Sequence, residues 1–142
     1  MGAGLDIVPR RLRIQLDGDE AAVRAALIPV ERINGPVLLI SGTDDRVWPS
    51  STMSDRVIAR LRDRAFAFPY EHLRDEGAGH VVLMPPWAIA PSGNRWPPSQ
   101  RERPAWAGQI EIGGTPDGNQ KARAHSWPRL LSFLASSLRQ SG

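Results

Sequence analysis

The chain has 142 residues, 41% of them hydrophobic and 23% charged, which is typical of one globular domain and argues against a disordered chain. It contains no cysteine, so disulfide bonds, cysteine zinc sites and thiol nucleophiles are excluded within it. The formal net charge is +3. However, the basic residues are interspersed with acids, which argues against a nucleic-acid-binding stripe.

The first part of the chain contains one predicted helix. Residues 1–17 carry no clear periodic pattern, and residues 1–20 lack the apolar stretch of a signal peptide. Acidic residues at 17–20 precede an alanine-rich run over 21–27, which predicts a short helix that ends before Pro29. No apolar run approaches the ~18 residues needed to cross a bilayer, so we expect a soluble, cytoplasmic protein.

The middle of the chain alternates between strand and helix patterns. A continuous apolar run bounded by glycines over residues 35–42 predicts a strand covered on both faces, as in a parallel sheet. From Ser50 onward the apolar residues recur with helical spacing, and Thr52 with Asp55 match a capping box. A shorter, more polar strand is predicted over residues 68–73.

The last part of the chain combines an irregular segment with one amphipathic helix. Residues 85–114 are rich in proline and tryptophan, which indicates a long loop of the kind that often forms a lid or a binding loop. Thr115 and Pro116 are a hydroxyl cap followed by proline at the first helical position, and an apolar face continues to Leu138. Pro128 removes an internal hydrogen bond, so we expect the helix to kink or divide there.

The order strand, helix, strand, helix predicts an α/β fold. It is typical of a mainly parallel sheet that is covered by helices. Two strands are too few for a freestanding sheet of that kind. We therefore expect residues 1–142 to form a single but incomplete domain with a long Pro/Trp-rich loop.

The candidate functional residues lie in the two loops that follow the predicted strands, where open α/β sheets place their catalytic groups. Asp45 follows the first strand, and His80 ends the turn after the second. An acid followed by a histidine is the late part of the Ser/Cys, Asp/Glu, His order of α/β-hydrolases. There the carboxylate orients the imidazole, which takes a proton from the nucleophile. Alternatively, Asp45 belongs to a capping turn and His80 to the surface.

Several segments resemble the C-terminal domain of the acyl-CoA thioesterase / bile acid-CoA:amino acid N-acyltransferase family. They are residues 28–42, 44–50, 77–80 and 113–116, together with 126–128. The match runs in order from about residue 28 to residue 138, and the combination of motifs is specific. The resemblance implies a partial α/β-hydrolase fold that consists of the last strands and helices of a mainly parallel sheet.

The resemblance also implies a reaction and residue roles. In the family, a Ser or Cys nucleophile attacks an acyl-CoA thioester, and the acyl group then passes to water or to an amino acid. By motif, Asp45 resembles the acid of the triad and His80 its base, while Asp44 is the competing acid one position earlier. In hydrolases of this kind the acid commonly follows a glycine by three positions, as Asp45 follows Gly42.

A nucleophile of the expected kind is missing from the sequence. There is no cysteine, and no serine has glycines two positions to either side, as a nucleophile elbow requires. We therefore expect a C-terminal piece of a hydrolase that is inactive alone, with its nucleophile supplied by missing sequence or by another chain. The alternative is a non-catalytic interaction module, or truncated remnant, that pairs through an exposed strand edge. A small hydrolase using Ser41 or Ser50 ranks lower.

The other candidate residues carry less weight. Tryptophans could line an acyl pocket, but packing of the long loop is favoured. His72 lies in a predicted strand and is expected to be structural, whereas His125 on the last helix is expected to face solvent. The histidine spacing predicts no metal site, and nothing in the sequence indicates a cofactor. Acyl-CoA is the partner that the resemblance implies, with neither nucleic acid nor a membrane span expected.

Overall fold

The structure is a computed structural model, which describes residues 18–83, 85 and 112–139. The elements in chain order are α2 (Glu20–Ala26), the 3-10 helix η1 (Val30–Arg32), β1 (Val37–Gly42), α3 (Ser50–Asp63), β2 (Tyr70–Asp75) and α4 (Pro116–Arg139). Residues 1–17 and most of the predicted Pro/Trp-rich loop, with Trp87, Trp96 and Trp106, lie outside the described residues.

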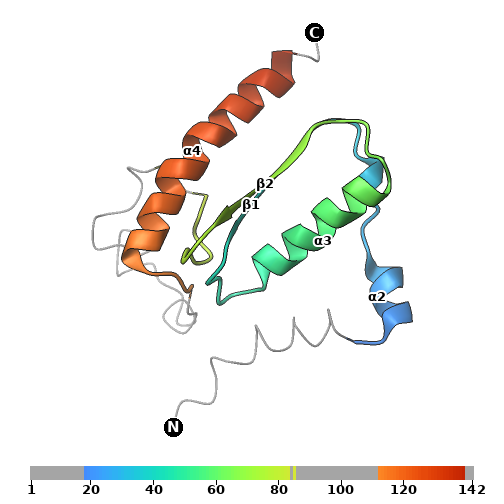
Figure 1. Cartoon of the computed structure of the whole chain (residues 1–142), viewed down its shortest axis with the longest axis horizontal. Coiled ribbons are helices and arrows are strands. Elements are labelled where there is room, and N and C mark those ends of the chain that lie inside the picture. The colour runs from blue at the N-terminus through green and yellow to red at the C-terminus, as the bar shows by residue number, and fades with distance from the viewer. Residues whose placement is uncertain (1–17, 84, 86–111, 140–142) are drawn as a thin grey trace, which may run out of the picture.

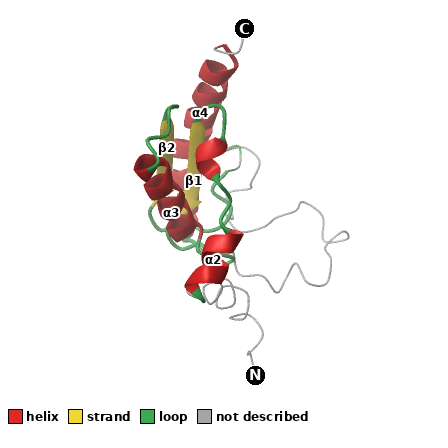
Figure 2. Cartoon of the chain, turned by 90° about the vertical axis from the view of Figure 1, so that its right-hand side faces the viewer, coloured by secondary structure: helices red, strands yellow, loops and turns green. Residues whose placement is uncertain are grey.

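The two strands form a parallel sheet that is covered on both faces. Val37 pairs with Tyr70 at one end of the register and Gly42 with Asp75 at the other. Helix α3 joins the strands and lies on one side of them, while α4 lies on the other (Figure 1). Figure 2, turned by 90°, shows the two strands side by side. The prediction of an α/β architecture with parallel strands is therefore confirmed for the described residues.

Alternation along the strands decides what each helix contacts, because successive side chains point to opposite faces. On one face, Ser41 of β1 bonds to Ser51 of α3. On the other, Ile40 packs against the buried cluster of Ala78, Val82 and Ala122, which joins the loop after β2 to α4. The core on this side is small, and two of its residues, Ala78 and Val82, flank His80 along the chain.

Two details of the predicted elements were wrong. Strand β2 spans Tyr70–Asp75 and not residues 68–73, because Pro69 has no N–H to donate and instead its carbonyl accepts from Val37 N–H at 3.0 Å. The predicted capping box is absent, since α3 begins at Ser50 and Thr52 therefore lies inside the first turn. Asp55 contacts β2 instead.

Helix α4 begins as predicted but is not divided by its proline. Thr115 Oγ1 accepts a hydrogen bond from Gly118 N–H at 2.9 Å, and Pro116 is the first helical residue. The helix continues through Pro128 to Arg139. Pro128 leaves the carbonyl of Ala124 without its N–H donor, and both residues are exposed, so water can bind that carbonyl.

The segment before β1 is short and tied to α3. Asp19 caps α2 by accepting from Ala21 N–H and Ala22 N–H, which confirms the predicted helix start. In η1, Glu31 accepts two hydrogen bonds from Arg60 of α3, at 2.6 and 2.7 Å. These hydrogen bonds lower the pKa of Glu31 from 4.5 to about 2. Among the described residues, no helix is long and apolar enough to span a membrane.

Candidate active site

The structure brings Asp45 and His80 together, as the sequence predicts. Asp45 lies in the turn between β1 and α3, and His80 lies in the loop after β2. Both loops leave the carboxyl ends of the parallel strands, so they meet at the same edge of the sheet. His80 Nδ1 lies 3.1 Å from Asp45 Oδ2. This pair is the centre of the candidate site.

The carboxylate of Asp45 is buried and fully bonded. Its side chain is 3% exposed. Oδ1 accepts hydrogen bonds from Val47 N–H at 2.9 Å and from Trp48 N–H at 3.2 Å, while Oδ2 faces His80. Since a carboxylate can only accept, its neighbour His80 Nδ1 must carry the hydrogen, which leaves His80 Nε2 as the acceptor in the neutral ring.

The imidazole of His80 contacts Trp48, the His80 backbone N–H is bonded to Ile112, and the side chain is partly exposed. The Trp48 ring meets it edge to face with centroids 4.8 Å apart, and His80 N–H donates to Ile112 carbonyl at 2.7 Å. The side chain is 30% exposed. Within the part of the chain that the structure describes, Nε2 has no hydrogen-bond partner. An oriented ring with a free Nε2 can accept a proton.

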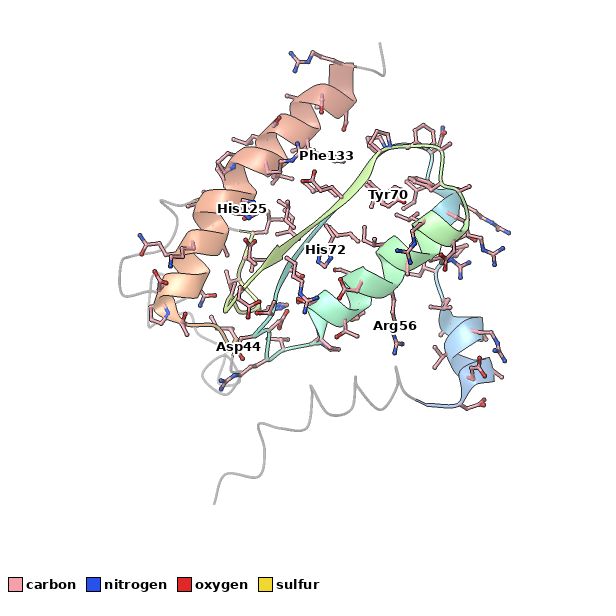
Figure 3. All side chains as sticks on the ribbon, in the orientation of Figure 1. Asp44, Arg56, Tyr70, His72, His125 and Phe133 are labelled. Atoms are coloured by element: carbon pink, nitrogen blue, oxygen red, sulfur yellow. The ribbon has the colours of Figure 1, made fainter. Side chains whose placement is uncertain are left out.

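Asp44, the competing acid of the sequence analysis, has a different contact. Its Oδ2 accepts from Gly114 N–H at 2.9 Å and its Oδ1 from Arg46 Nε at 3.2 Å. We call residues 112–115, which run up to α4, the strap. Asp44 binds the strap, and Asp45 is the carboxylate that contacts His80. Figure 3 shows Asp44 at the end of the sheet opposite Tyr70.

Glycines allow the strap to lie directly against the two loops. A Cβ on Gly79 would lie 2.2 Å from the carbonyl oxygen of Gly113. A Cβ on Gly113 would lie 1.9 Å from the carbonyl oxygen of Asp44, and its φ of +72° is one that glycine adopts without cost. Backbone therefore meets backbone on both sides of the Asp45–His80 pair.

His72 belongs to a second Ser, His and Asp arrangement on the α3 face. Its Nδ1 lies 3.2 Å from Asp55 Oδ1, and its Nε2 lies 2.7 Å from Ser41 Oγ. Figure 3 shows His72 between the strands and α3. Ser41 is 1% exposed and also contacts Ser51 Oγ at 2.9 Å. A hydroxyl this buried cannot reach a thioester, so the arrangement supports the structural role expected for His72.

His125 forms a third pair, between α4 and β2. Its Nδ1 lies 2.7 Å from Asp75 Oδ1, and its ring is 57% exposed, which agrees with the solvent-facing position predicted for it (Figure 3). Asp75 Oδ2 is buried without a hydrogen-bond partner among the described residues. This acid is therefore only half satisfied, unlike Asp45.

Asn119 of α4 is a further contact of the site that the sequence analysis missed. Its Oδ1 accepts from Gly79 N–H at 2.7 Å, and its Nδ2 donates to Gly113 carbonyl at 3.4 Å. It is 1% exposed. The available signal was its spacing from Ala122 and Ser126, which places an amide on the buried face of an amphipathic helix.

The model of the family described as "BAAT / Acyl-CoA thioester hydrolase C terminal" matches residues 10–140. The chain belongs to this family. The resemblance noted in separate segments of the sequence is thereby confirmed over most of the chain.

Curated relatives of this BAAT and thioesterase family chain include both named activities. The mouse "Peroxisomal succinyl-coenzyme A thioesterase" is 27% identical over 94% of this chain and 29% of its own length. The rat "Acyl-coenzyme A amino acid N-acyltransferase 2" is 30% identical over 82% of this chain and 26% of its own length. The chain thus spans less than a third of these relatives.

Other features of this BAAT-family chain do not add to the site. Among the described residues, no group of three or more His, Cys, Asp or Glu side chains could hold a metal ion. A cavity of about 320 Å³ lies at the other end of the sheet and is lined by Val37, Pro69, Tyr70, Glu71, Arg129 and Phe133. Figure 3 shows Tyr70 and Phe133 far from Asp44, so this cavity is separate from the Asp45–His80 pair.

Proposed function

We propose that this chain supplies the acid and the base of an acyl-CoA thioester hydrolase or acyltransferase, with His80 as general base and Asp45 as its orienting acid. The observation that carries the proposal is the 3.1 Å contact between His80 Nδ1 and a carboxylate that is 3% exposed. Burial and two backbone donors fix the carboxylate. The base is left partly open to solvent, as proton transfer to a substrate requires.

The chemistry follows from the roles of the two side chains. His80 Nε2 takes the proton of a hydroxyl or thiol nucleophile as that group attacks the thioester carbonyl, and the imidazolium formed is stabilised by Asp45. The same proton then passes to the leaving coenzyme A sulfur, which completes an acyl-enzyme. In the second half, His80 takes a proton from the acceptor, water or an amino acid amine, as the acceptor attacks the acyl group. His80 then gives this proton to the nucleophile as the bond between the nucleophile and the acyl group breaks.

The nucleophile in this proposal comes from outside these 142 residues. The sequence has no cysteine and no serine in elbow context. Ser41, the serine in contact with a histidine, is 1% exposed. The relatives are also more than three times as long as the region they share with this chain, which leaves room in them for a nucleophile elsewhere. On this proposal the chain forms part of a larger α/β-hydrolase domain and does not hydrolyse acyl-CoA alone.

A chimera tests the proposal. This chain would replace the matching segment of the mouse peroxisomal succinyl-CoA thioesterase, and release of the coenzyme A thiol from succinyl-CoA would be measured. We expect thioester hydrolysis by the chimera. His80→Gln should lower kcat by about 10³-fold or more, because the base is lost. The matched variant His125→Gln, which breaks the other exposed His–Asp pair, should keep kcat within about twofold.

The assay has clear contradicting outcomes. Equal kcat values for the His80→Gln and His125→Gln chimeras would remove His80 from the reaction. Hydrolysis by the isolated chain, abolished in its own His80→Gln variant, would show that the nucleophile lies within these residues.

A non-catalytic interaction module is the second candidate. Within the described residues, β1 pairs with β2 along one edge and has no strand on the other, and this edge is where another segment would add a strand in such a module. Size-exclusion chromatography with light scattering distinguishes the cases. Strand pairing predicts concentration-dependent assembly of the isolated chain, whereas a stable monomer contradicts it.

Cytoplasmic localisation also stays a prediction, which imaging of a fluorescent fusion would test.

A further inference from the structure

The two segments that flank His80 are joined by one buried side chain. Gly79 directly precedes His80, and Ile112, in the strap, accepts the His80 N–H at 2.7 Å. Asn119 bonds to both segments: it accepts from Gly79 N–H at 2.7 Å and donates to the carbonyl of Gly113, the residue after Ile112. We call the loop after β2 that carries His80, residues 76–83, the base loop. The Asn119 amide therefore bridges the base loop and the strap next to His80.

The burial of this bridge makes its bonds hard to replace. Asn119 is 1% exposed, and Gly79 is buried as well. If the amide were removed, the Gly79 N–H would lose its acceptor in a place that water does not reach. A buried donor without an acceptor destabilises the local structure more than the average hydrogen bond stabilises it. The loop would then be expected to open at Gly79.

The anchor of Asn119 is itself well fixed. Thr115 N–H donates to Gly77 carbonyl at 2.9 Å, and Thr115 caps the first turn of α4. Asn119 N–H donates to Thr115 carbonyl at 2.9 Å, which continues the helix from that cap. The start of α4 is thus bonded to the base loop twice, through the backbone of Thr115 and through the side chain of Asn119. The position of the helix therefore affects the position of His80.

We propose that Asn119 is the positioning residue of His80, the side chain that holds the base loop and the strap together so that the imidazole stays against Asp45. Asn119 acts on His80 through the backbone of Gly79 and Gly113, to which its amide is bonded. This role rests on the proposed function of His80 as base. Its test, however, reads the geometry of His80 without any substrate, so the two proposals fail separately.

The test compares Asn119→Ala with Ser126→Ala in the full chain. Ser126 is a matched control: it is also fully buried on α4, and its Oγ donates to the carbonyl of Val82, two residues after His80, at 2.9 Å. Each variant removes one buried tether between α4 and this loop. The first readout is the rate of amide hydrogen exchange at Gly79 divided by the rate at Thr43. Thr43 lies at the start of the turn that carries Asp45, and its N–H donates to Asp75 carbonyl.

Asn119→Ala should accelerate exchange at Gly79 relative to Thr43 by about tenfold or more, while Ser126→Ala should leave that ratio within about threefold. The second readout is the proton NMR signal of the His80 Nδ1–H, assigned by its absence in His80→Gln. The signal should weaken or disappear in Asn119→Ala and persist in Ser126→Ala. An unchanged Gly79 ratio in Asn119→Ala, or equal loss of the His80 signal in both variants, would overturn the proposal.

A conservative variant covers the case in which Asn119→Ala does not fold. Asn119→Asp keeps an acceptor for Gly79 N–H and loses the donor to Gly113 carbonyl. The exchange ratio at Gly79 should therefore stay within about threefold of the original chain. The His80 Nδ1–H signal should weaken in this variant, because the bond from the side chain to the strap is lost. A signal as strong as in the original chain would contradict the positioning role.

Discussion

The carboxyl edge of the sheet and its α3 face carry histidine–aspartate pairs with opposite burial. At the carboxyl ends of the strands the acid is hidden and the base open, since Asp45 is 3% exposed and His80 30%. On the α3 face the order is reversed, since the His72 side chain is 8% exposed and Asp55 49%. His72 also has both ring nitrogens occupied, one of them by a buried serine.

The contrast shows that distance alone does not identify a catalytic pair. By distances, Ser41, His72 and Asp55 satisfy the geometry of a triad better than Asp45 and His80, which have no serine bonded to the imidazole among the described residues. A base must exchange protons with a substrate, which requires an open nitrogen. The buried arrangement instead joins β1, β2 and α3, and its bonds are expected to contribute to stability.

The largest expected effect is a difference in stability between variants of the two acids, Asp45 and Asp55. Asp45→Ala should lower the free energy of unfolding by about 2–3 kcal/mol, because the removed carboxylate is 3% exposed and accepts from Val47 N–H, Trp48 N–H and His80 Nδ1. Asp55→Ala should cost about 1 kcal/mol, because that carboxylate is half exposed and water can replace it. Urea denaturation measures both, and equal losses would contradict the assigned difference in burial.

Ser41→Ala separates the two arrangements by function. Loss of the hydroxyl should lower the free energy of unfolding by about 1.5 kcal/mol, since His72 Nε2 and Ser51 lose a buried partner. In the chimera described above, kcat should stay within about twofold of the unsubstituted chimera. A kcat loss as large as that of His80→Gln would instead identify Ser41 as the nucleophile.

Chemical modification compares the two imidazoles directly. Diethyl pyrocarbonate reacts with unprotonated, accessible ring nitrogens, so His80 should be modified and His72 should be protected. Peptide mapping by mass spectrometry gives the rate at each position. The chain unfolded in urea is the control, because both histidines should then react alike. Equal rates in the folded chain would refute the difference in accessibility.

The smallest expected effect concerns an ion pair outside both arrangements. Glu31 has its pKa lowered to about 2 by hydrogen bonds from Arg60, so its ionised form stabilises the fold. That contribution is complete above about pH 4.5 and is lost as the pH falls toward 2. Glu31→Gln should therefore lower Tm slightly at pH 7 and leave it unchanged near pH 2, as thermal circular dichroism can measure. A constant difference in Tm across this range would contradict it.

The local pattern of the sequence was sufficient for the order of the main helices and strands and for one pair of residues. Continuous apolar residues predicted β1, and Thr115 with Pro116 predicted the start of α4. The order of Asp45 and His80 after successive strands predicted their contact, because parallel strands end at the same edge. Their catalytic roles remain proposals.

The contacts that the sequence did not predict join distant positions through the backbone. Asp44 meets the N–H of Gly114, and Asn119 meets that of Gly79, so neither contact needs a particular partner side chain. The buried group around His72 depends on the register of β1 against β2, which places Leu39 opposite His72. The predicted strand was displaced by two residues and gave no such register.

The contact between Trp48 and His80 makes the candidate site accessible to fluorescence spectroscopy. The rings lie 4.8 Å apart, edge to face, and Trp48 is 45% exposed. A protonated imidazole quenches indole emission at such a distance. A variant that keeps Trp48 and carries phenylalanine at the other tryptophan positions would therefore report by fluorescence when His80 gains a proton, without substrate and in real time.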